Sequence, residues 1–142
     1  MTRMSPDECR VFLSEGCRTG KLATVRADGR PHVAPIWFVA DGDELVLMTH
    51  EETVKARSLR HEPRVMLSVD DEVFPFAFVL VEGMASLERL SPAELLPWSR
   101  RIAARYVPDE RIEATAERNA VEGELLVRIR ISKMMGSRDV AG

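Results

Sequence analysis

The sequence predicts a mainly β domain with peripheral helices, an α+β fold built on a six-stranded antiparallel barrel. Six runs of β-prone residues occur along the chain, most of them joined by connections of hairpin length. Only one connection before residue 90 has a helical pattern, whereas a parallel doubly wound sheet would need a helix after nearly every strand. At 142 residues the chain is long enough for one core, so we expect a single domain over residues 1–142.

The composition restricts the classes of partner. Lys and Arg number 20 against 23 Asp and Glu, so no global field attracts nucleic acid or an anionic membrane. The apolar runs are far shorter than the ~20 residues that span a bilayer, and the N-terminus lacks the apolar region of a signal peptide. Cys9 and Cys17 are too few for a disulfide framework and indicate free thiols in a reducing compartment. We therefore expect a soluble, cytoplasmic protein.

The first element is a short amphipathic helix. Ser5, Pro6 and Glu8 match an N-cap, a first helical residue and a capping-box acid, and the helix is expected to end near Gly16. Strands are then predicted at about residues 20–26, 31–40 and 44–49, separated by the turn sequences "ADGR" and "ADGD".

The second of these strands carries two prolines. Pro31 and Pro35 cannot donate hydrogen bonds to a ladder, so the strand is expected at an edge or to be bulged. One side of its backbone is then free to contact a ligand.

The rest of the chain alternates helices and strands. A helix is predicted from Glu51 to His61, followed by the strands "RVMLSV" and "PFAFVLVEGMASLERL", the latter bent at Gly83. Ser91 caps a helix that Pro97 should kink, and the charged residues 107–124 are expected to form surface helix or loop. "ELLVRIRIS" predicts a last strand with one wetter face, and we interpret its Arg128 and Arg130 as solvated.

The segment "THEETVKARSLRHEPRV" concentrates positive charge immediately after a strand. A helix N-terminus at this point favours an anion, to which Thr49 and Thr53 can add hydroxyl donors and Lys55 and Arg57 positive charge. These residues predict a phosphate site. The alternative is a solvated helix in which Glu51, Glu52 and Glu62 offset the cations.

Other chemistries have little support. The three histidines do not show metal-ligand spacing, so we expect no metal site, although His32 lies on the strand that is free to contact a ligand. No G-x-S-x-G, G-x-G-x-x-G or Walker pattern occurs, and neither cysteine lies in a nucleophile signature.

The ordered combination "DGRP", "DG", "T…K.R.L…PRV" and "EG", over about residues 16–90, resembles the pyridoxamine 5′-phosphate oxidase-like split β-barrels. Within that superfamily it most resembles the deazaflavin reductases that use coenzyme F420. The resemblance implies a split barrel and a homodimer whose protomers build cofactor sites at their interface. Val54 stands where the vitamin-oxidising relatives carry arginine, so oxidation of pyridoxamine phosphate is disfavoured.

The resemblance also assigns cofactor contacts. A strand segment would run along the flavin-like ring, the end of the third strand would lie near the linker and phosphate, and the following helix would hold the phosphate and any anionic tail. An aromatic at the start of the long strand would lie near the ring or substrate, in its own site or in that of the partner protomer. The residues implied are His32, Val33, Pro35, Ile36, Trp37, Met48, Thr49, Thr53, Lys55, Arg57 and Phe76.

Three functional hypotheses follow. The first is an F420-dependent oxidoreductase that transfers hydride between the deazaflavin and a small organic acceptor, with no catalytic residue identified and protonation from solvent. The second keeps the fold and uses FMN. The third is a flavin- or haem-binding protein without turnover. None of them involves nucleic acid or a membrane.

Overall fold

The computed structural model describes residues 1–142, which form strands, α-helices and one 3₁₀ helix. In chain order these elements are β1 (Thr2–Arg3), α1 (Pro6–Ser14), β2 (Gly20–Val25), β3 (Pro31–Ile36), β4 (Val39–Asp41), β5 (Glu44–His50), α2 (Val54–His61), β6 (Arg64–Asp71), β7 (Ala77–Arg89), α3 (Pro92–Tyr106), η1 (Asp109–Arg111), α4 (Ile112–Asn119) and β8 (Glu124–Arg138).

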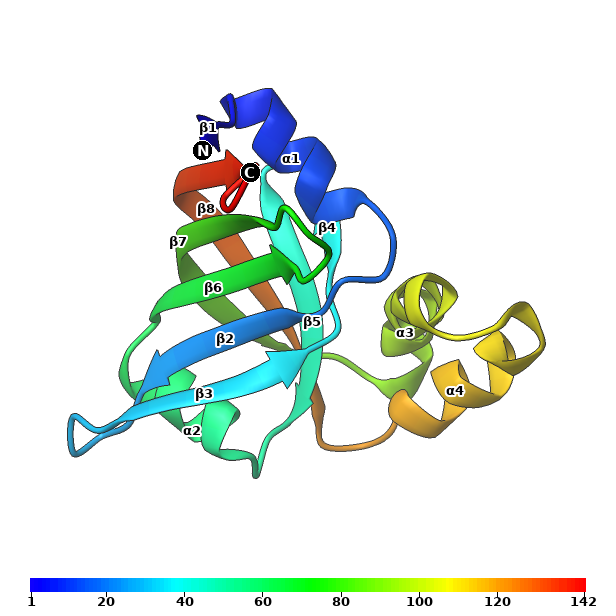
Figure 1. Ribbon diagram of the computed structural model, residues 1–142. Coiled ribbons are helices and arrows are strands. Elements are labelled where there is room, and N and C mark those ends of the chain that lie inside the picture. Colours follow the sequence, from blue (N-terminus) through cyan, green and yellow to red (C-terminus); the bar gives the residue numbers. More distant parts are fainter.

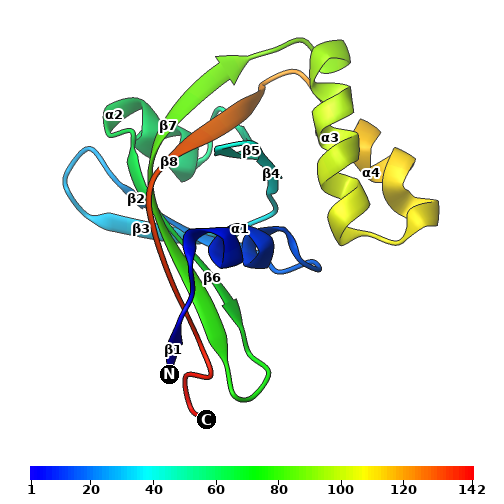
Figure 2. The ribbon, with the colours of Figure 1, turned by 90° about the horizontal axis from the view of Figure 1, so that it is seen from above.

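The strands form one antiparallel sheet in the order β3-β2-β6-β7-β8-β5-β4, with β1 added to the end of β8. β3 and β4 lie at opposite ends of this order, yet only Trp37 and Phe38 separate them in the chain. The sheet must therefore curl until its two ends meet, as Figures 1 and 2 show.

The expected strand count of six is wrong, because the sheet has eight strands. One addition is the two-residue β1. The other arises because the strand expected over residues 31–40 is broken at Trp37 and Phe38. At the break, the Phe38 N–H donates to the Tyr106 hydroxyl at 3.2 Å and its carbonyl accepts from Arg105 at 2.7 Å. Helix α3 thus satisfies backbone groups that a continuous strand would have paired within the sheet.

The edge position expected from the prolines is confirmed. β3 pairs with β2 alone, with Pro31 opposite Val25 and Pro35 opposite Lys21. Its other backbone edge carries no strand.

Helices α1 and α2 cover opposite ends of the curled sheet (Figure 1). The capping box between Ser5 and Glu8 begins α1 as expected, and Phe12 and Leu13 enter the main core. Helix α2 begins at Val54, later than the expected Glu51, because Thr53 serves as its N-cap. It contributes Leu59 to the same core.

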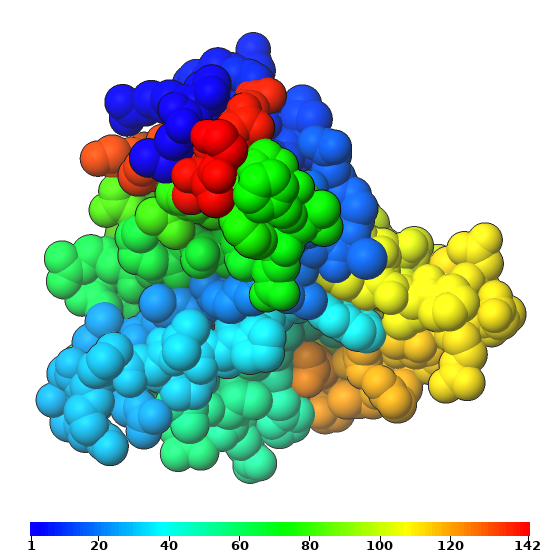
Figure 3. Space-filling view, in the orientation of Figure 1, coloured from blue at the N-terminus to red at the C-terminus, as the bar shows by residue number.

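Helix α3 packs against the outside of the sheet, where it forms a second apolar cluster with β4, β5, β8 and Ala120, and α4 packs against α3. Ser91 and Glu94 form the expected capping box of α3, and the surface segment after it contains η1 and α4. Leu95 and Ile102 of α3 pack with Leu126 of β8, so the expectation of a wetter face along this strand is wrong at Leu126. The space-filling view shows these helices, yellow to orange, standing out beside the sheet (Figure 3).

Gly83 lies at the expected irregularity of the long strand. The β7–β8 register shifts between Glu82 and Gly83. A Cβ at Gly83 would lie 2.7 Å from the Arg130 carbonyl oxygen and 2.6 Å from Cγ2 of Ile129. The absence of a side chain therefore permits the close approach of β7 to its neighbour β8 at this irregularity.

No helix in the structure has both the length and the apolar character needed to cross a membrane.

Candidate functional site

A cavity of about 310 Å³ lies where the end of β3, the end of β5 and the start of α2 meet α3, α4 and the start of β8. Apolar and polar side chains share its wall in similar numbers. The lining residues are Pro35, Ile36, Trp37, Met48, Thr49, Lys55, Ser99, Ile102, Asn119 and Glu124.

The cavity brings together more than half of the residues expected to contact a cofactor. Those that line it are Pro35, Ile36, Trp37, Met48, Thr49 and Lys55. They come from three elements that are adjacent because the sheet curls: β3 leads into the break at Trp37, and β5 leads into α2. Their contact with a cofactor stays a prediction, which their position around one cavity supports.

Trp37 forms a wall of the cavity whose orientation depends on α3. Its ring stacks on Tyr106 with centroids 5.1 Å apart and planes at 7°. The Tyr106 hydroxyl donates to the Arg18 carbonyl at 2.9 Å and accepts from the Phe38 N–H at 3.2 Å. Burial raises the pKa of Tyr106, which keeps this hydroxyl protonated as a donor. Trp37 is consequently held by one fixed ring while 37% of its surface stays exposed.

Arg105, the residue before Tyr106, has a structural role. Its guanidinium donates to the carbonyls of Phe38 and Leu13, each at 2.7 Å, and of Gly16 at 3.0 Å. Burial lowers the pKa of Arg105, but arginine remains charged at neutral pH. These bonds tie α3 to the chain that follows α1.

Lys55 is the cation that the cavity contains. It lies in the first turn of α2, and none of the ion pairs or side-chain hydrogen bonds in the structure includes its ammonium group. A cation without a protein partner, beside an apolar wall, fits a ligand that has a phosphate at one end and a ring at the other.

Arg57 does not share this cavity. Its guanidinium donates to the Glu52 carbonyl at 2.7 Å, and it lines a different hollow with Arg26 and Asp28. The separation follows from helix geometry, since side chains two residues apart point to different faces.

The hydroxyls of Thr49 and Thr53 are used within the protein. The Thr53 hydroxyl donates to the His50 carbonyl at 2.9 Å and accepts from the Ala56 N–H at 3.1 Å. Since Thr53 has used its hydrogen, Thr49 is the donor in the 2.8 Å contact between the two hydroxyls. The expected hydroxyl donors therefore organise the start of α2, and neither presents a free hydrogen to a ligand.

Glu124 faces the same cavity from the first position of β8. Burial raises the pKa of Glu124, while the nearby His50 and Lys55 act in the opposite direction. Its carboxyl group takes part in no ion pair or hydrogen bond of the structure.

The remaining expected contacts lie away from the cavity. His32 pairs with Thr24 across β2 and β3, and its buried Nδ1 has no hydrogen-bond partner. Val33 is 66% exposed on the outer face of β3. Phe76 lies in the turn before β7, has a φ of 70° and packs edge-to-face against Phe74.

Sequence reasoning missed four residues of the lining: Ser99, Ile102, Asn119 and Glu124. Ile102 carried a helical pattern that indicated core packing. Glu124 had one signal, an acidic residue at the start of a strongly apolar strand. Nothing local connected α3 or α4 with the segment that contains Lys55.

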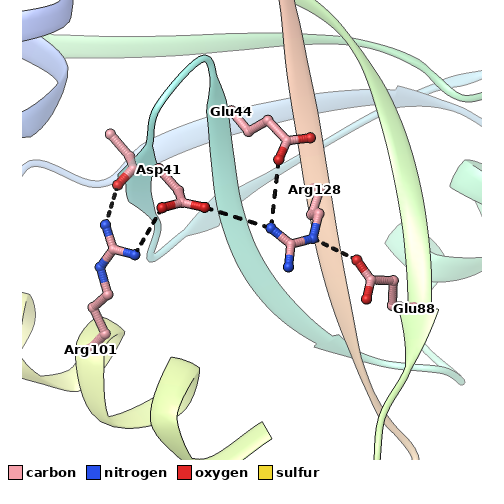
Figure 4. A network of polar contacts seen from close by, with 6 residues as sticks. Asp41, Glu44, Glu88, Arg101 and Arg128 are labelled. Carbon is pink, nitrogen blue, oxygen red and sulfur yellow. Dashed lines mark hydrogen bonds and ion pairs between the residues drawn. The ribbon is translucent and has the colours of Figure 1, made fainter. Parts of the chain in front are cut away.

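An ionic network holds α3 against the sheet (Figure 4). Arg128 of β8 pairs with Glu88, with Glu44 at 3.6 Å and with Asp41 at 3.7 Å. On α3, Arg101 pairs with the same Asp41 at 3.3 Å. The interpretation of Arg128 as a solvated cation is wrong, because three carboxylates compensate it and its side chain is 24% exposed.

The indole of Trp98 completes this attachment. The guanidinium carbons of Arg101 and Arg128 lie 5.3 Å and 5.0 Å from the centroid of its ring. The network thereby positions the helix that supplies Ser99 and Ile102 to the cavity.

No group of three or more His, Cys, Asp or Glu side chains is arranged to hold a metal ion. The unpaired ammonium of Lys55 beside the apolar side chains of Ile36, Trp37 and Met48 is instead suited to an organic anion.

Solved structures with the same fold bind different cofactors. An F420 reductase is 27% identical with a TM-score of 0.69, over 86% of this chain and 92% of that one. A FAD-binding protein from Mesorhizobium loti is 23% identical with a TM-score of 0.70, over 94% and 93% of the two chains. The haem storage protein HutZ from Vibrio cholerae is 20% identical with a TM-score of 0.69, over 91% and 92%. The latter two similarities establish the fold alone.

The family comparison covers nearly the whole chain. The family model for pyridoxamine 5′-phosphate oxidase matches residues 5–136. This range includes β2 to β7 in full and all of β8 except its last two residues. The solved structures of the FMN-binding split-barrel superfamily agree with this match in overall fold. The chain belongs to the pyridoxamine 5′-phosphate oxidase family.

Proposed function

We propose that this protein is a coenzyme F420-dependent oxidoreductase that acts on a small organic acceptor. The observation that carries the proposal is the unpaired ammonium of Lys55 in a cavity walled by Ile36, Trp37 and Met48. The 27% identity to an F420 reductase supports deazaflavin over the other cofactors of the family.

The residues of the chain divide the work of binding and orientation. Lys55 holds the phosphate, while Trp37 and Met48 orient the ring and exclude water. The open edge of β3 offers backbone groups to the ring. When bound, the reduced deazaflavin supplies the hydride.

A homodimer is part of the proposal. A cavity of about 310 Å³ is at the lower limit of ligand pockets, roughly 300–1,000 Å³, and is small for an extended coenzyme. The outer face of the sheet carries exposed apolar side chains on successive strands: Val33, Val25, Met66, Met84 and Met135. A second copy on this face would cover them and extend the site, with Phe76 offered to the partner's ring or substrate.

A cytoplasmic location also belongs to the proposal. Both cysteines are free, and Cys17 is exposed, which suits a reducing compartment.

The test is titration of the protein with F420 and with FMN. A Lys55→Met variant should weaken binding of both by about 10- to 100-fold, as expected for a lost charge-assisted hydrogen bond. Arg60→Met is the matched control, since Arg60 lies on the same helix and donates to the Glu51 carbonyl outside the cavity. Unchanged affinity in Lys55→Met would refute the phosphate site.

Arg57 distinguishes the two cofactors. A ligand that ends at the phosphate needs no contact with Arg57, which lines a different hollow from Lys55, whereas a longer anionic tail would extend past the N-terminal end of α2. Arg57→Met should therefore weaken F420 and leave FMN unchanged. FMN binding that equals or exceeds F420 binding would instead favour the FMN-dependent oxidoreductase.

Turnover separates an enzyme from a binding protein. Oxidation of the bound reduced cofactor should be followed with quinones, enones, nitro compounds and tetrapyrroles. Tight binding without oxidation by any of them would favour the flavin- or haem-binding alternative, the class represented in this fold by HutZ.

A further inference from the structure

Two opposite charges face the cavity from different elements, and neither has a partner. Lys55 comes from α2, and Glu124 comes from the first position of β8. The β5–β8 register brings them together, because Glu124 pairs with His50 at the end of β5 and α2 begins shortly after His50. The chain has thus placed a carboxyl group within the space that Lys55 offers to an anion.

An ionised Glu124 opposes any anion in this cavity. Two negative charges within a partly desolvated space repel one another, and the repulsion is relieved when the carboxyl group binds a proton. Burial already raises the pKa of Glu124, with Lys55 among the groups that act against the rise. An anion bound to Lys55 neutralises the positive charge that lowers the pKa of Glu124, so binding of the anion raises this pKa further.

We propose that Glu124 makes anion binding in this cavity proton-linked: a phosphate-bearing ligand binds when Glu124 carries a proton, and the neutral carboxyl group donates a hydrogen bond into the cavity. The proposal rests on the proposed phosphate site of Lys55 but not on the identity of the cofactor. It gives Glu124 a role that depends on chemistry shared by any phosphate ligand.

None of the other charged groups around Glu124 presents an unpaired carboxyl group to the cavity. His50 lies beside it on β5, with Nδ1 accepting the Glu52 N–H at 3.2 Å. The Glu51 N–H donates to the Gly123 carbonyl at 2.9 Å, but the Glu51 carboxylate is paired with Arg89. Glu122 is exposed, and the cavity residues of α3 and α4 near Glu124 are the neutral Ser99 and Asn119.

The experiment measures dissociation constants for F420, FMN and inorganic phosphate from about pH 5 to about pH 8, in the native protein and in Glu124→Gln. The ratio of the two constants cancels the ligand's own titration. Native affinity should fall relative to Glu124→Gln by up to about tenfold per pH unit once Glu124 ionises. Calorimetry in buffers of different ionisation enthalpy should show proton uptake on binding at neutral pH by the native protein, reduced in the variant.

Two matched variants isolate the group. Glu122→Gln removes the neighbouring exposed carboxylate, and His50→Gln replaces the imidazole that lies opposite Glu124 across β5 and β8. Both should retain the pH dependence of the native protein. The proposal is overturned if the affinity of His50→Gln relative to Glu124→Gln no longer changes with pH. It is also overturned if Glu124→Gln takes up as many protons on binding as the native protein, since another residue then carries the linkage.

The outcomes for function and for proton linkage differ. If FMN or phosphate shows the linkage while F420 does not bind, the proposed function fails and the role of Glu124 holds. If F420 binds with a ratio that does not change with pH, the role of Glu124 fails and the function holds. Failure of all three ligands to bind would overturn both.

Discussion

Cations that look alike in the sequence meet different neighbours in the folded chain. Arg57 bonds a backbone carbonyl, and Arg128 is surrounded by three carboxylates. Lys55 lies in a cavity without a partner from its own chain. The free energy of an ion pair with a ligand is available where the protein has not already used the charge, so Lys55 is the better candidate for binding.

Glu124 yields a prediction about stability and pH. Since burial raises the pKa of Glu124, the folded state holds a proton that the unfolded state releases near its ordinary pKa of about 4.3. Stability is therefore lost as pH rises from that value through the raised pKa. Glu124→Gln should match the native protein at low pH and be more stable at neutral pH, as measured by urea unfolding over a pH series.

The exposed Glu122→Gln is the control and should change stability by less than about 0.5 kcal/mol at every pH. A Glu124→Gln protein that is less stable than the native protein at neutral pH would show that the ionised carboxylate has a stabilising partner.

At the scale of elements, α3 matters most to the site. Its C-terminal end is attached to the break between β3 and β4 through Tyr106 and Arg105, and its middle is attached to the sheet through Arg101 and Trp98. Its inner side packs Leu95 and Ile102 against the second apolar cluster. One helix thus determines both the orientation of Trp37 and the position of the cavity's outer wall.

Replacing Arg128 by Met should destabilise the protein by about 1–3 kcal/mol, because Glu44 and Glu88 lose their cation while Asp41 keeps only Arg101. Added salt should restore part of the loss by screening the carboxylates. Denaturant unfolding at low and high salt measures both effects. The neighbouring Arg130→Met is the control, since Arg130 is exposed and takes part in none of these ion pairs.

Tyr106→Phe should lower stability by about 1–2 kcal/mol, because the hydroxyl bonds to Arg18 and Phe38 are lost. The ring remains, so the stack on Trp37 and the affinity for a cofactor should be preserved. Tyr106→Leu removes the ring as well and should weaken binding, as measured by titration. Equal affinity in both variants would mean that the stack does not orient Trp37 for binding.

At the scale of the whole molecule, the curled sheet leaves one apolar face exposed. Val33 is 66% exposed, and Val25, Met66, Met84 and Met135 are each between 39% and 42% exposed. These residues belong to the adjacent strands β3, β2, β6, β7 and β8. A homodimer would bury them, and a specific interface of this kind covers roughly 800 Å² of each partner.

Met66→Glu should therefore convert a dimer into a monomer, because an unpaired carboxylate would be buried at the centre of the interface. Sedimentation velocity at micromolar concentration measures the change. Val11→Glu is the control, since Val11 is 59% exposed on α1, outside this face. A native protein that sediments as a monomer would refute the dimer and leave the small cavity without its proposed completion.

Local signals in the sequence determined much of the fold. The caps at Ser5 and Ser91 act within a single helical turn, so α1 and α3 begin where expected. Gly29 and Gly42 adopt the positive φ that the "ADGR" and "ADGD" turns require, at 88° and 60°. Pro31 and Pro35 determined the edge position of β3, because a missing N–H excludes a strand from the middle of a sheet whatever its distant neighbours are.

Tertiary structure decided the rest. The break at Phe38 depends on Tyr106 and Arg105, which lie more than sixty positions away in the chain. The burial of Leu126 and the meeting of Glu124 with Lys55 likewise require elements that are distant in sequence, whereas the Thr49 and Thr53 hydroxyls bond to each other and to residues within one turn. Residue patterns report the contacts available within a turn or a hairpin, whereas a cavity is formed by whichever elements the closed sheet brings together.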